Sequence, residues 1–559
     1  MYRYDDDDQR LIETRVDQFR DQTHRYLRGE LSEDDFRPLR LQNGLYRLRH
    51  TTMLRIAIPY GLATAAQLRR LARIARHYRL GDLHFTTRQN VQVNGPALAE
   101  VPEILAELAQ VQLHAIQTSG NCIRGITTDH LAGIAVDERV DPRPWCELLR
   151  QWSHRHPEFT RLPRKFKLAV SGADEDRALL QVHDLGLEAH LDAQGEVAFR
   201  VLVGGGLGRS PMLALELASS LHWRHLLTYC AAILRVYDRH GRRDDIHKAR
   251  LKFLVRTLGR AAFQELVETE WASLKDGPGT LTAESVQRVS TRFADLPLAP
   301  PPGNNFAYRR ALEGNRAFAA WARHNVRAHR QPGYAIVTLS TKRSGVAPGD
   351  VSPELLERVA AWADDYSLGE VRVSQRQNLI LPQVRERDLR ALWVEVREAG
   401  LASPNAGLLT DLVACPGGRY CDLSRTQTAP LADAILARFA RHDLRASIGP
   451  LDIRLSGCVN GCAQHAVGHI GIRGVEKAGA SRFQISLGGD SGRTARIGAV
   501  LGPALPEDEV PEAIHTLIGT YLDQRQDDER FVDTLRRIGP EPFAEALLAP
   551  RISAQAANG

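Results

Sequence analysis

The sequence predicts an α+β protein that is internally duplicated, with two similar halves packed about a pseudo-twofold axis. Residues 80–90 read LGDLHFTTRQN and residues 368–378 read LGEVRVSQRQN, and each segment follows a helical pattern. Further matches come in the same order: KLAVSG with IRLSG, VHDLGL with VGHIGI, and FRVLVGGGLGR with FQISLGGDSGR. A stretch rich in proline and glycine, LPLAPPPGNN at 296–305, separates the halves. Each half is therefore expected to contain a helix-bearing α+β unit and then an α/β unit, with a cleft between the halves.

Each repeat opens with a predicted helix and continues with a predicted strand. The first helix has Thr64 as its N-cap and Gln67 three residues later, and the second has Ser352 as its N-cap and Pro353 at its first position. The following segments, LHFTTRQNVQV and VRVSQRQNLIL, alternate with the two-residue period of a half-buried strand. We expect each of them to form one strand.

Composition narrows the class of protein. The chain has 559 residues, of which 43% are hydrophobic and 25% charged, as in a globular protein of several domains. It lacks a long apolar run, so no membrane span is predicted, and MYRYDDDDQR at its start is not a secretory signal, so a cytoplasmic location is expected. The net charge of +6 comes from 73 basic and 67 acidic residues without a basic tract. This mixture argues against nucleic-acid binding and fits a basic face that docks an acidic protein.

Four of the seven cysteines form a group: Cys415 and Cys421 in ACPGGRYC, then Cys458 and Cys462 in SGCVNGCAQH. A zinc site, disulfides and an iron–sulfur cluster are the alternatives. The first pair is spaced too widely for a zinc knuckle, and disulfides are disfavoured in the cytoplasm. Four thiolates on loosely spaced loops favour a [4Fe–4S] cluster, with zinc second. The remaining cysteines are expected to be packing residues: Cys122, Cys146 and Cys230.

The segments CPGGRYC and RLSGCVNGCAQH closely resemble the sirohaem and iron–sulfur signature of the nitrite/sulfite reductase family. The resemblance covers roughly residues 40 to 540 and implies that the four grouped cysteines bind a [4Fe–4S] cluster. It also implies that Cys462 bridges the cluster to the iron of sirohaem. Asn460 lies in the same loop, where it either shapes the turn or contacts the macrocycle.

Together, the repeat and the resemblance imply seven segments along the chain. They are an N-terminal segment (1–40), a first ferredoxin-like half-repeat (41–112), a first sirohaem/iron–sulfur-type domain (113–295), a linker (296–325), a second ferredoxin-like half-repeat (326–400), a second sirohaem/iron–sulfur domain (401–545) and a tail (546–559).

Four cations are, by the same resemblance, the catalytic residues that bind the substrate anion. They are Arg55 in MLRIAIP, Arg124 in GNCIRGIT, and Lys165 and Lys167 in LPRKFKLAV. Residues two apart in a strand point to the same side, so the two lysines are expected to converge on one ligand. Such cations would bind an oxyanion, polarise its bonds and relay protons.

The segment HFTTRQNVQVNG resembles the family's strand that binds the sirohaem carboxylates. Arg88 is the first candidate, followed by Thr86 and Gln92, while His84 and Asn94 are weaker candidates on the same predicted face. Two further residues are open: Arg376 is the repeat equivalent of Arg88 and serves cofactor or structure, and His465 is expected to pack beside the cluster rather than relay protons.

The function implied by the resemblance is the six-electron reduction of sulfite to sulfide in assimilatory sulfur metabolism. Reduction of nitrite to ammonia is the alternative, and a non-catalytic sirohaem or cluster protein that carries electrons or acts as a sensor is a more distant one. Sulfite-specific members tend to carry a lysine pair such as KFK, which Lys167 completes here. No flavin or NAD(P) unit remains once both halves are assigned, so the electron donor is expected to be ferredoxin or a separate flavoprotein.

Overall fold

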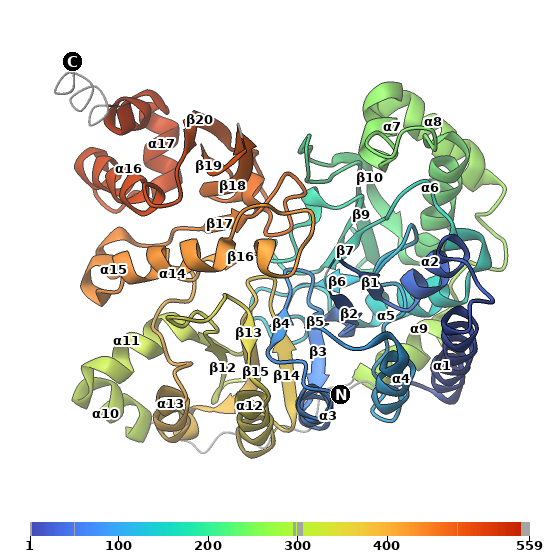
Figure 1. Cartoon of the computed structure of the whole chain (residues 1–559), viewed down its shortest axis with the longest axis horizontal. Helices are drawn as coiled ribbons and strands as arrows, with labels where there is room; N and C mark the ends of the chain where they lie inside the picture. Colours follow the sequence, from blue (N-terminus) through green and yellow to red (C-terminus); the bar gives the residue numbers. More distant parts are fainter. Residues whose placement is uncertain (1–2, 50, 294–297, 299–305, 478, 549–559) are drawn as a thin grey trace.

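The computed structural model describes residues 3–49, 51–293, 298, 306–477 and 479–548. Within these residues, four five-stranded sheets are covered by helices (Figure 1). Two sheets form a lower layer, and the other two lie above it on either side. None of the described helices has the length and hydropathy needed to cross a bilayer.

Two helices precede the first sheet, α1 (Asp6–Leu27) and α2 (Glu33–Gln42), which begin at the capping side chains of Asp5 and Ser32. A buried ion pair between Asp8 and Arg150, with N–O at 2.5 Å, fixes α1 to helix α5 (Arg143–Arg155). The N-terminal segment is therefore part of the first half.

The two lower sheets exchange a strand, which confirms the duplication and its pseudo-twofold axis. The first sheet has the order β1 (Leu45–Arg47), β2 (Thr52–Ile56), β5 (Val91–Asn94), β4 (Leu83–Phe85) and β13 (Asp350–Val351). The second has the order β11 (Val326–Ala328), β12 (Tyr334–Leu339), β15 (Leu379–Arg385), β14 (Glu370–Val373) and β3 (Leu62–Thr64). Thus β13 of the second half completes the first sheet, and β3 of the first half completes the second.

One hydrophobic core lies beneath both sheets. It is covered by α3 (Ala65–His77), α4 (Val101–Ala109), α12 (Pro353–Tyr366) and α13 (Leu389–Glu398). Thr64 and Gln67 form the expected capping box of α3, and Ser352 caps α12 with Pro353 at its first position. Both helix starts are therefore confirmed.

The two upper sheets repeat one topology, in which the first three strands are parallel and the rest antiparallel. The first comprises β6 (Thr127–Thr128), β7 (Leu168–Ser171), β8 (Leu185–Leu191), β9 (Val197–Val203) and β10 (Leu215–His222), with helices α5, α6 (Leu226–His240), α7 (Leu251–Leu258), α8 (Arg260–Ala272) and α9 (Ala283–Ser290). The second comprises β16 (Val413–Ala414), β17 (Ile453–Ser456), β18 (Ile470–Lys477), β19 (Ala480–Leu487) and β20 (Ala499–Leu505), with α14 (Thr428–Arg438), α15 (His442–Ile448), α16 (Val510–Gln524) and α17 (Phe531–Ile538). Each has its own hydrophobic core.

Short 3-10 turns connect these elements: η1 (Pro59–Gly61), η2 (Leu98–Glu100), η3 (Pro157–Thr160), η4 (Leu180–Val182), η5 (Trp223–His225), η6 (Thr291–Phe293), η7 (Glu386–Asp388), η8 (Gly417–Arg419) and η9 (His465–Val467). Of the predicted linker 296–325, residues 296–297 and 299–305 lie outside the described residues, and Phe306–Asn325 forms two helices, α10 (Phe306–Gly314) and α11 (Arg316–Asn325). Most of the predicted tail also lies outside the described residues.

The prediction of a single strand after each helix is wrong. In the first half β4 and β5 are antiparallel neighbours, joined by a tight turn in which the Thr86 N–H donates to the Asn90 carbonyl at 2.9 Å. Gln89 at the tip has φ +56°, and its counterpart Gln377 has φ +64°. Alternating polarity cannot distinguish a strand from a hairpin whose turn carries polar side chains.

Candidate active site

All twelve residues that the sequence singled out as site residues line one cavity of about 460 Å³. The cavity is bordered by β2 and the β4–β5 turn of the first half, by the segment that leads into β7, and by the cysteine loops of the second half. The twelve are Arg55, Thr86, Arg88, Gln92, Arg124, Lys165, Lys167, Cys415, Cys421, Cys458, Asn460 and Cys462.

Close backbone packing brings the two cysteine loops together. The N–H of Gly457 donates to the Cys415 sulfur at 3.1 Å, and the Gly457 carbonyl accepts hydrogen bonds from Ser424 and Thr426. A Cβ at position 457 would lie 2.3 Å from the Ser424 hydroxyl and 3.2 Å from the Cα of Gly417. Glycine is required here because the loop after β17 must press against the loop after β16.

A contact from the other half holds the loop that carries Cys458 and Cys462. The hydroxyl of Thr87, in the β4–β5 turn, donates to the carbonyl of Cys462 at 2.8 Å. Gly461, with φ +62°, reverses the chain between the two cysteines. The side chain of Cys462 is exposed toward the cavity, while the other three are half-buried.

The four thiols line one cavity but do not converge on a single metal-binding point. All seven cysteines are free, and no three Cys, His, Asp or Glu side chains of the described chain lie close enough to hold one metal ion. Burial raises the pKa of Cys415 to about 12, and the neighbouring Cys462 adds to the rise. A thiol in such a place becomes a thiolate when a cation draws off its proton. This donor set fits a cluster with separated corners better than a single zinc ion.

Backbone carbonyls, rather than carboxylates, hold the two arginines predicted to bind the substrate anion. Arg55 on β2 donates to the Gln92 side chain at 3.1 Å and to the Thr118 carbonyl at 3.2 Å. Arg124 donates to the same Thr118 carbonyl at 2.9 Å and to the Gly120 carbonyl. Since carbonyls orient a guanidinium without neutralising it, both residues keep their charge for an anion.

Lys165 and Lys167 reach the cavity from the segment that leads into β7. The strand itself starts at Leu168, but a parallel bridge between Phe166 and Ile123 extends the ladder and buries Phe166 between the two lysines. Within the described residues neither ammonium group has a hydrogen bond or ion pair. Burial lowers the pKa of Lys165 to about 7, with Arg250 and Arg124 contributing, and it lowers the pKa of Lys167 further, with Lys165 contributing. An anion in the cavity would relieve this repulsion.

The β4–β5 turn presents Arg88 to the cavity. The hydroxyl of Thr86 accepts the backbone N–H groups of Arg88 and Asn90, so it shapes the turn as well as lining the cavity. The Arg88 guanidinium contacts the His183 ring at 2.7 Å and the Gly125 carbonyl at 2.7 Å. Within the described residues it forms no ion pair with a carboxylate.

Four weaker candidates are placed differently. His84 lines the cavity but bonds through Nδ1 to Asp350 of β13 at 2.7 Å. Asn94 and Arg376 are not among the residues that line it, and Arg376 is held by carboxylates. His465 is buried under the cysteine loop, and burial lowers its pKa to about 4.

The sequence reasoning missed several residues that support the site, notably His183, Thr87 and Asp184. Asp184 is fully buried, accepts the Lys167 N–H at 2.8 Å and pairs with Arg250 at 2.7 Å. The segment VHDLGL, which contains His183 and Asp184, stands out in the sequence only as part of the repeat. The signal that could have identified these residues is the difference from the matching segment VGHIGI, which has glycine and histidine where VHDLGL has His183 and Asp184.

Fold and site define a duplicated iron–sulfur redox protein with a cationic cavity at the junction of its halves. The family model of the nitrite and sulphite reductase 4Fe-4S domain matches residues 119–275 and 407–553. The model of the nitrite/sulfite reductase ferredoxin-like half domain matches residues 46–111 and 327–399. The chain therefore belongs to the nitrite and sulfite reductase family. Each half of the repeat contains one match to each of the two family models.

Named relatives and one solved structure agree with this assignment. A protein named sulfite reductase [ferredoxin] 2 from Mycolicibacterium paratuberculosis is 29% identical over 500 residues, which cover 87% of this chain and 82% of that protein. The chloroplastic ferredoxin–nitrite reductase of Arabidopsis thaliana is 30% identical over 496 residues, which cover 85% and 78%. The structure of the Mycobacterium tuberculosis NirA protein matches with a TM-score of 0.75 and 25% identity over 92% of each chain.

The protein is thus an oxidoreductase of the family whose cofactors are a [4Fe–4S] cluster and sirohaem. The cavity fits both groups: four thiols can ligate the cluster, and five cations without carboxylate partners in the described chain can receive the carboxylates of sirohaem and a substrate anion. These assignments replace the zinc and disulfide alternatives. When bound, the pair supplies electrons one at a time and an iron that holds the substrate.

Proposed function

We propose that the protein reduces sulfite to sulfide by six electrons in assimilatory sulfur metabolism, with nitrite reduction to ammonia as the second candidate. The observation that carries the choice is the pair Lys165 and Lys167, which line the cavity together without partners in the described residues. Two ammonium groups suit the two negative charges of sulfite, whereas nitrite carries one. Relatives named for either reaction are about equally similar, so their names do not decide between the anions.

In this proposal the cavity's cations share the work of binding and protonation. Arg55 and Arg124, fixed by carbonyls, hold the oxygens of the anion. Lys165, whose pKa burial lowers to about 7, gives up a proton readily at neutral pH as oxygen leaves as water. Arg88, Thr86 and Gln92 lie where they can receive sirohaem carboxylates, and Asn460 where it can contact the macrocycle.

Cys462 is proposed as the ligand shared by cluster and sirohaem, with Cys415, Cys421 and Cys458 completing the cluster. Its support is its position, exposed toward the cavity beside the lysines and the Thr87 contact. Cys462→Ser should lose the optical and magnetic signature of a coupled centre, because an alkoxide bridges such irons poorly. A Cys462→Ser protein with the parent's spectrum would refute the bridge.

An acidic ferredoxin is the proposed electron donor, with a flavoprotein as the alternative. Leu423, two residues after Cys421, is 70% exposed, and Arg419 and Arg425, which precede and follow it in the chain, have side chains that are 52% and 66% exposed. An exposed apolar residue between two exposed arginines fits a small, transient contact with an acidic redox protein. The cytoplasm is the proposed location, since seven free cysteines suit a reducing compartment.

The test begins with the optical spectrum and iron content of the purified protein, followed by assays with sulfite and nitrite side by side. A one-electron chemical donor makes the comparison independent of the protein donor. A larger kcat/KM for sulfite supports the first proposal, and a larger value for nitrite the second. A spectrum of sirohaem with turnover of neither anion would leave a carrier or sensor.

A further inference from the structure

The pseudo-twofold axis places a second arginine in the position of Arg88. The turns at 86–90 and 374–378 share the sequence Arg-Gln-Asn. Their glutamines make the same cross-axis bond, Gln89 to the Val373 carbonyl and Gln377 to the Phe85 carbonyl, each at 3.1 Å. The two arginines also donate to equivalent carbonyls, Arg88 to Gly125 at 2.7 Å and Arg376 to Asp411 at 3.0 Å. The chain thus holds two copies of one cationic position.

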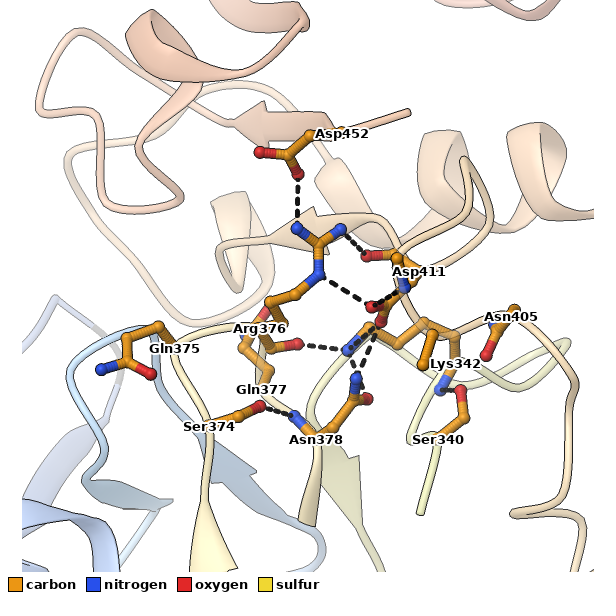
Figure 2. A network of polar contacts seen from close by, with 12 residues as sticks. Ser340, Lys342, Ser374, Gln375, Arg376, Gln377, Asn378, Asn405, Asp411 and Asp452 are labelled. Atoms are coloured by element: carbon orange, nitrogen blue, oxygen red, sulfur yellow. Dashed lines mark hydrogen bonds and ion pairs between the residues drawn. The ribbon is translucent and has the colours of Figure 1, made fainter. Parts of the chain in front are cut away.

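In the second copy the charge is neutralised by carboxylates (Figure 2). Arg376 pairs through Nε with Asp411 at 2.7 Å and through a terminal nitrogen with Asp452 at 2.9 Å. Buried Lys342 also faces Asp411, at 3.4 Å. Burial works against the charge of Arg376, but Asp452 and Asp411 outweigh it and raise the pKa. Arg376 is thus paired with two carboxylates, one of which, Asp452, also pairs with Arg454 at 2.6 Å.

In the first copy Arg88 is held by a neutral ring. The Nδ1 of His183 lies 2.8 Å from the Leu179 carbonyl, and its Nε2 lies 2.7 Å from Arg88. Because a carbonyl can only accept, Nδ1 carries the hydrogen and Nε2 offers its lone pair to the guanidinium. Burial lowers the pKa of Arg88 to about 9, with Arg124 adding to the effect and Asp184 opposing it, and within the described residues no carboxylate forms an ion pair with the guanidinium.

Strand register shows which substitutions separate the copies. Leu168 pairs with Leu185 in the first upper sheet as Ile453 pairs with Ile470 in the second. Lys167 directly precedes Leu168, and Asp452 directly precedes Ile453, so these two positions are equivalent. His183 lies two residues before Leu185, and Gly468 lies two residues before Ile470, so these positions are equivalent as well. The copy that lines the cavity therefore has a lysine where the closed copy has a carboxylate, and a histidine where the closed copy has no side chain.

We infer that His183 is a positioning residue, which fixes Arg88 through an uncharged acceptor so that the guanidinium keeps its charge for a carboxylate of bound sirohaem. A carboxylate at position 183 would orient Arg88 equally well but would cancel its charge, as Asp452 and Asp411 cancel that of Arg376. The inference rests on the proposed function, in which the cavity binds sirohaem. It adds that His183 leaves Arg88 without a carboxylate partner.

The test compares His183→Gln with His183→Glu, which have similar size and differ in charge. Sirohaem and iron per chain are measured on each purified holoenzyme, together with the apparent unfolding temperature. His183→Gln should retain nearly the parent's sirohaem, whereas His183→Glu should hold it about tenfold more weakly, the effect of one lost charge-assisted contact. Equal retention, or equal loss, in the two variants would overturn the inference.

Two further variants make the result independent of how well the glutamate variant folds. His183→Ala leaves Arg88 charged and held only by the Gly125 carbonyl, so it should lose part of the sirohaem that His183→Gln retains; full retention by alanine would contradict a positioning role. Asp452→Asn, in the closed copy, should lower the unfolding temperature and leave sirohaem content unchanged. A parent protein without sirohaem would overturn the proposed function itself, whereas a loaded parent with indistinguishable variants would overturn only the role of His183.

Discussion

At the scale of single residues, Lys167 is the cation on which the choice of substrate depends. It lies beside Lys165 with no partner in the described residues, and its own backbone is fixed by Asp184. Lys167→Asn should weaken sulfite turnover more than nitrite turnover, because a lost charge-assisted contact costs about 1.5–3 kcal/mol, or about tenfold and more in kcat/KM. Lys167→Arg, which keeps the charge, is the control. An equal loss for both anions would remove the reason for preferring sulfite.

Lys165 gives the site a pH dependence. Its ammonium holds an anion only while protonated, so anion affinity is present below its pKa and is lost as pH rises through it. The pKa is lowered to about 7 by burial and by Arg250 and Arg124, and carboxylates of bound sirohaem would move it upward from there. We expect the KM for nitrite, which stays anionic throughout, to rise as pH passes through this upward-shifted pKa, at a pH above about 7. In Lys165→Arg this rise should vanish; its persistence would place the titration elsewhere.

At the scale of elements, the glycines before the exchanged strands occupy positions where any side chain would be strained. Gly61 has φ +75°, and a Cβ there would lie 2.7 Å from the Val373 carbonyl oxygen. Gly349 repeats this on the other side, with φ +89° and the Phe85 carbonyl at 2.7 Å. Either contact would push a strand away from the sheet that it completes.

Gly61→Ala should therefore lower the apparent unfolding temperature well beyond Gly81→Ala, which serves as the matched control. Gly81 also has a positive φ, +70°, but no atom lies within 4 Å of its Cβ position. The control carries only the conformational cost of about 1–2 kcal/mol, whereas Gly61→Ala adds a clash with a backbone oxygen. Thermal scans of both variants measure the difference, and equal shifts would show that the clash relaxes freely.

At the scale of the whole molecule, a net charge of +6 and the cations near Cys421 predict that donor docking is electrostatic. Turnover with an acidic ferredoxin should fall steeply with salt, because the Debye length shrinks from about 10 Å at 0.1 M to about 3 Å at 1 M. A small uncharged or cationic donor controls for screening of the substrate anion, and its slope should be much shallower. Identical slopes would mean that docking does not depend on charge.

The sequence by itself determined the duplication and the helix starts, and it supplied the residues that we propose for the site. Repeated segments mark the halves because each half must fold its own sheet, and capping residues act locally. The cysteine spacing and the motifs around Arg55, Arg124 and the lysines named residues that the fold then brought to one cavity. These features were readable because each depends on neighbours along the chain.

Only the tertiary structure decided which copy of a repeated residue is free to bind. Arg88 and Arg376 lie in the same local sequence, yet one meets a neutral histidine and the other meets Asp411 and Asp452. The turn within 83–94 and the exchange of β3 and β13 between the sheets likewise could not be predicted from the sequence. Charge compensation and strand partners come from segments far apart in the chain, and a guanidinium's availability depends on the field that those segments create around it.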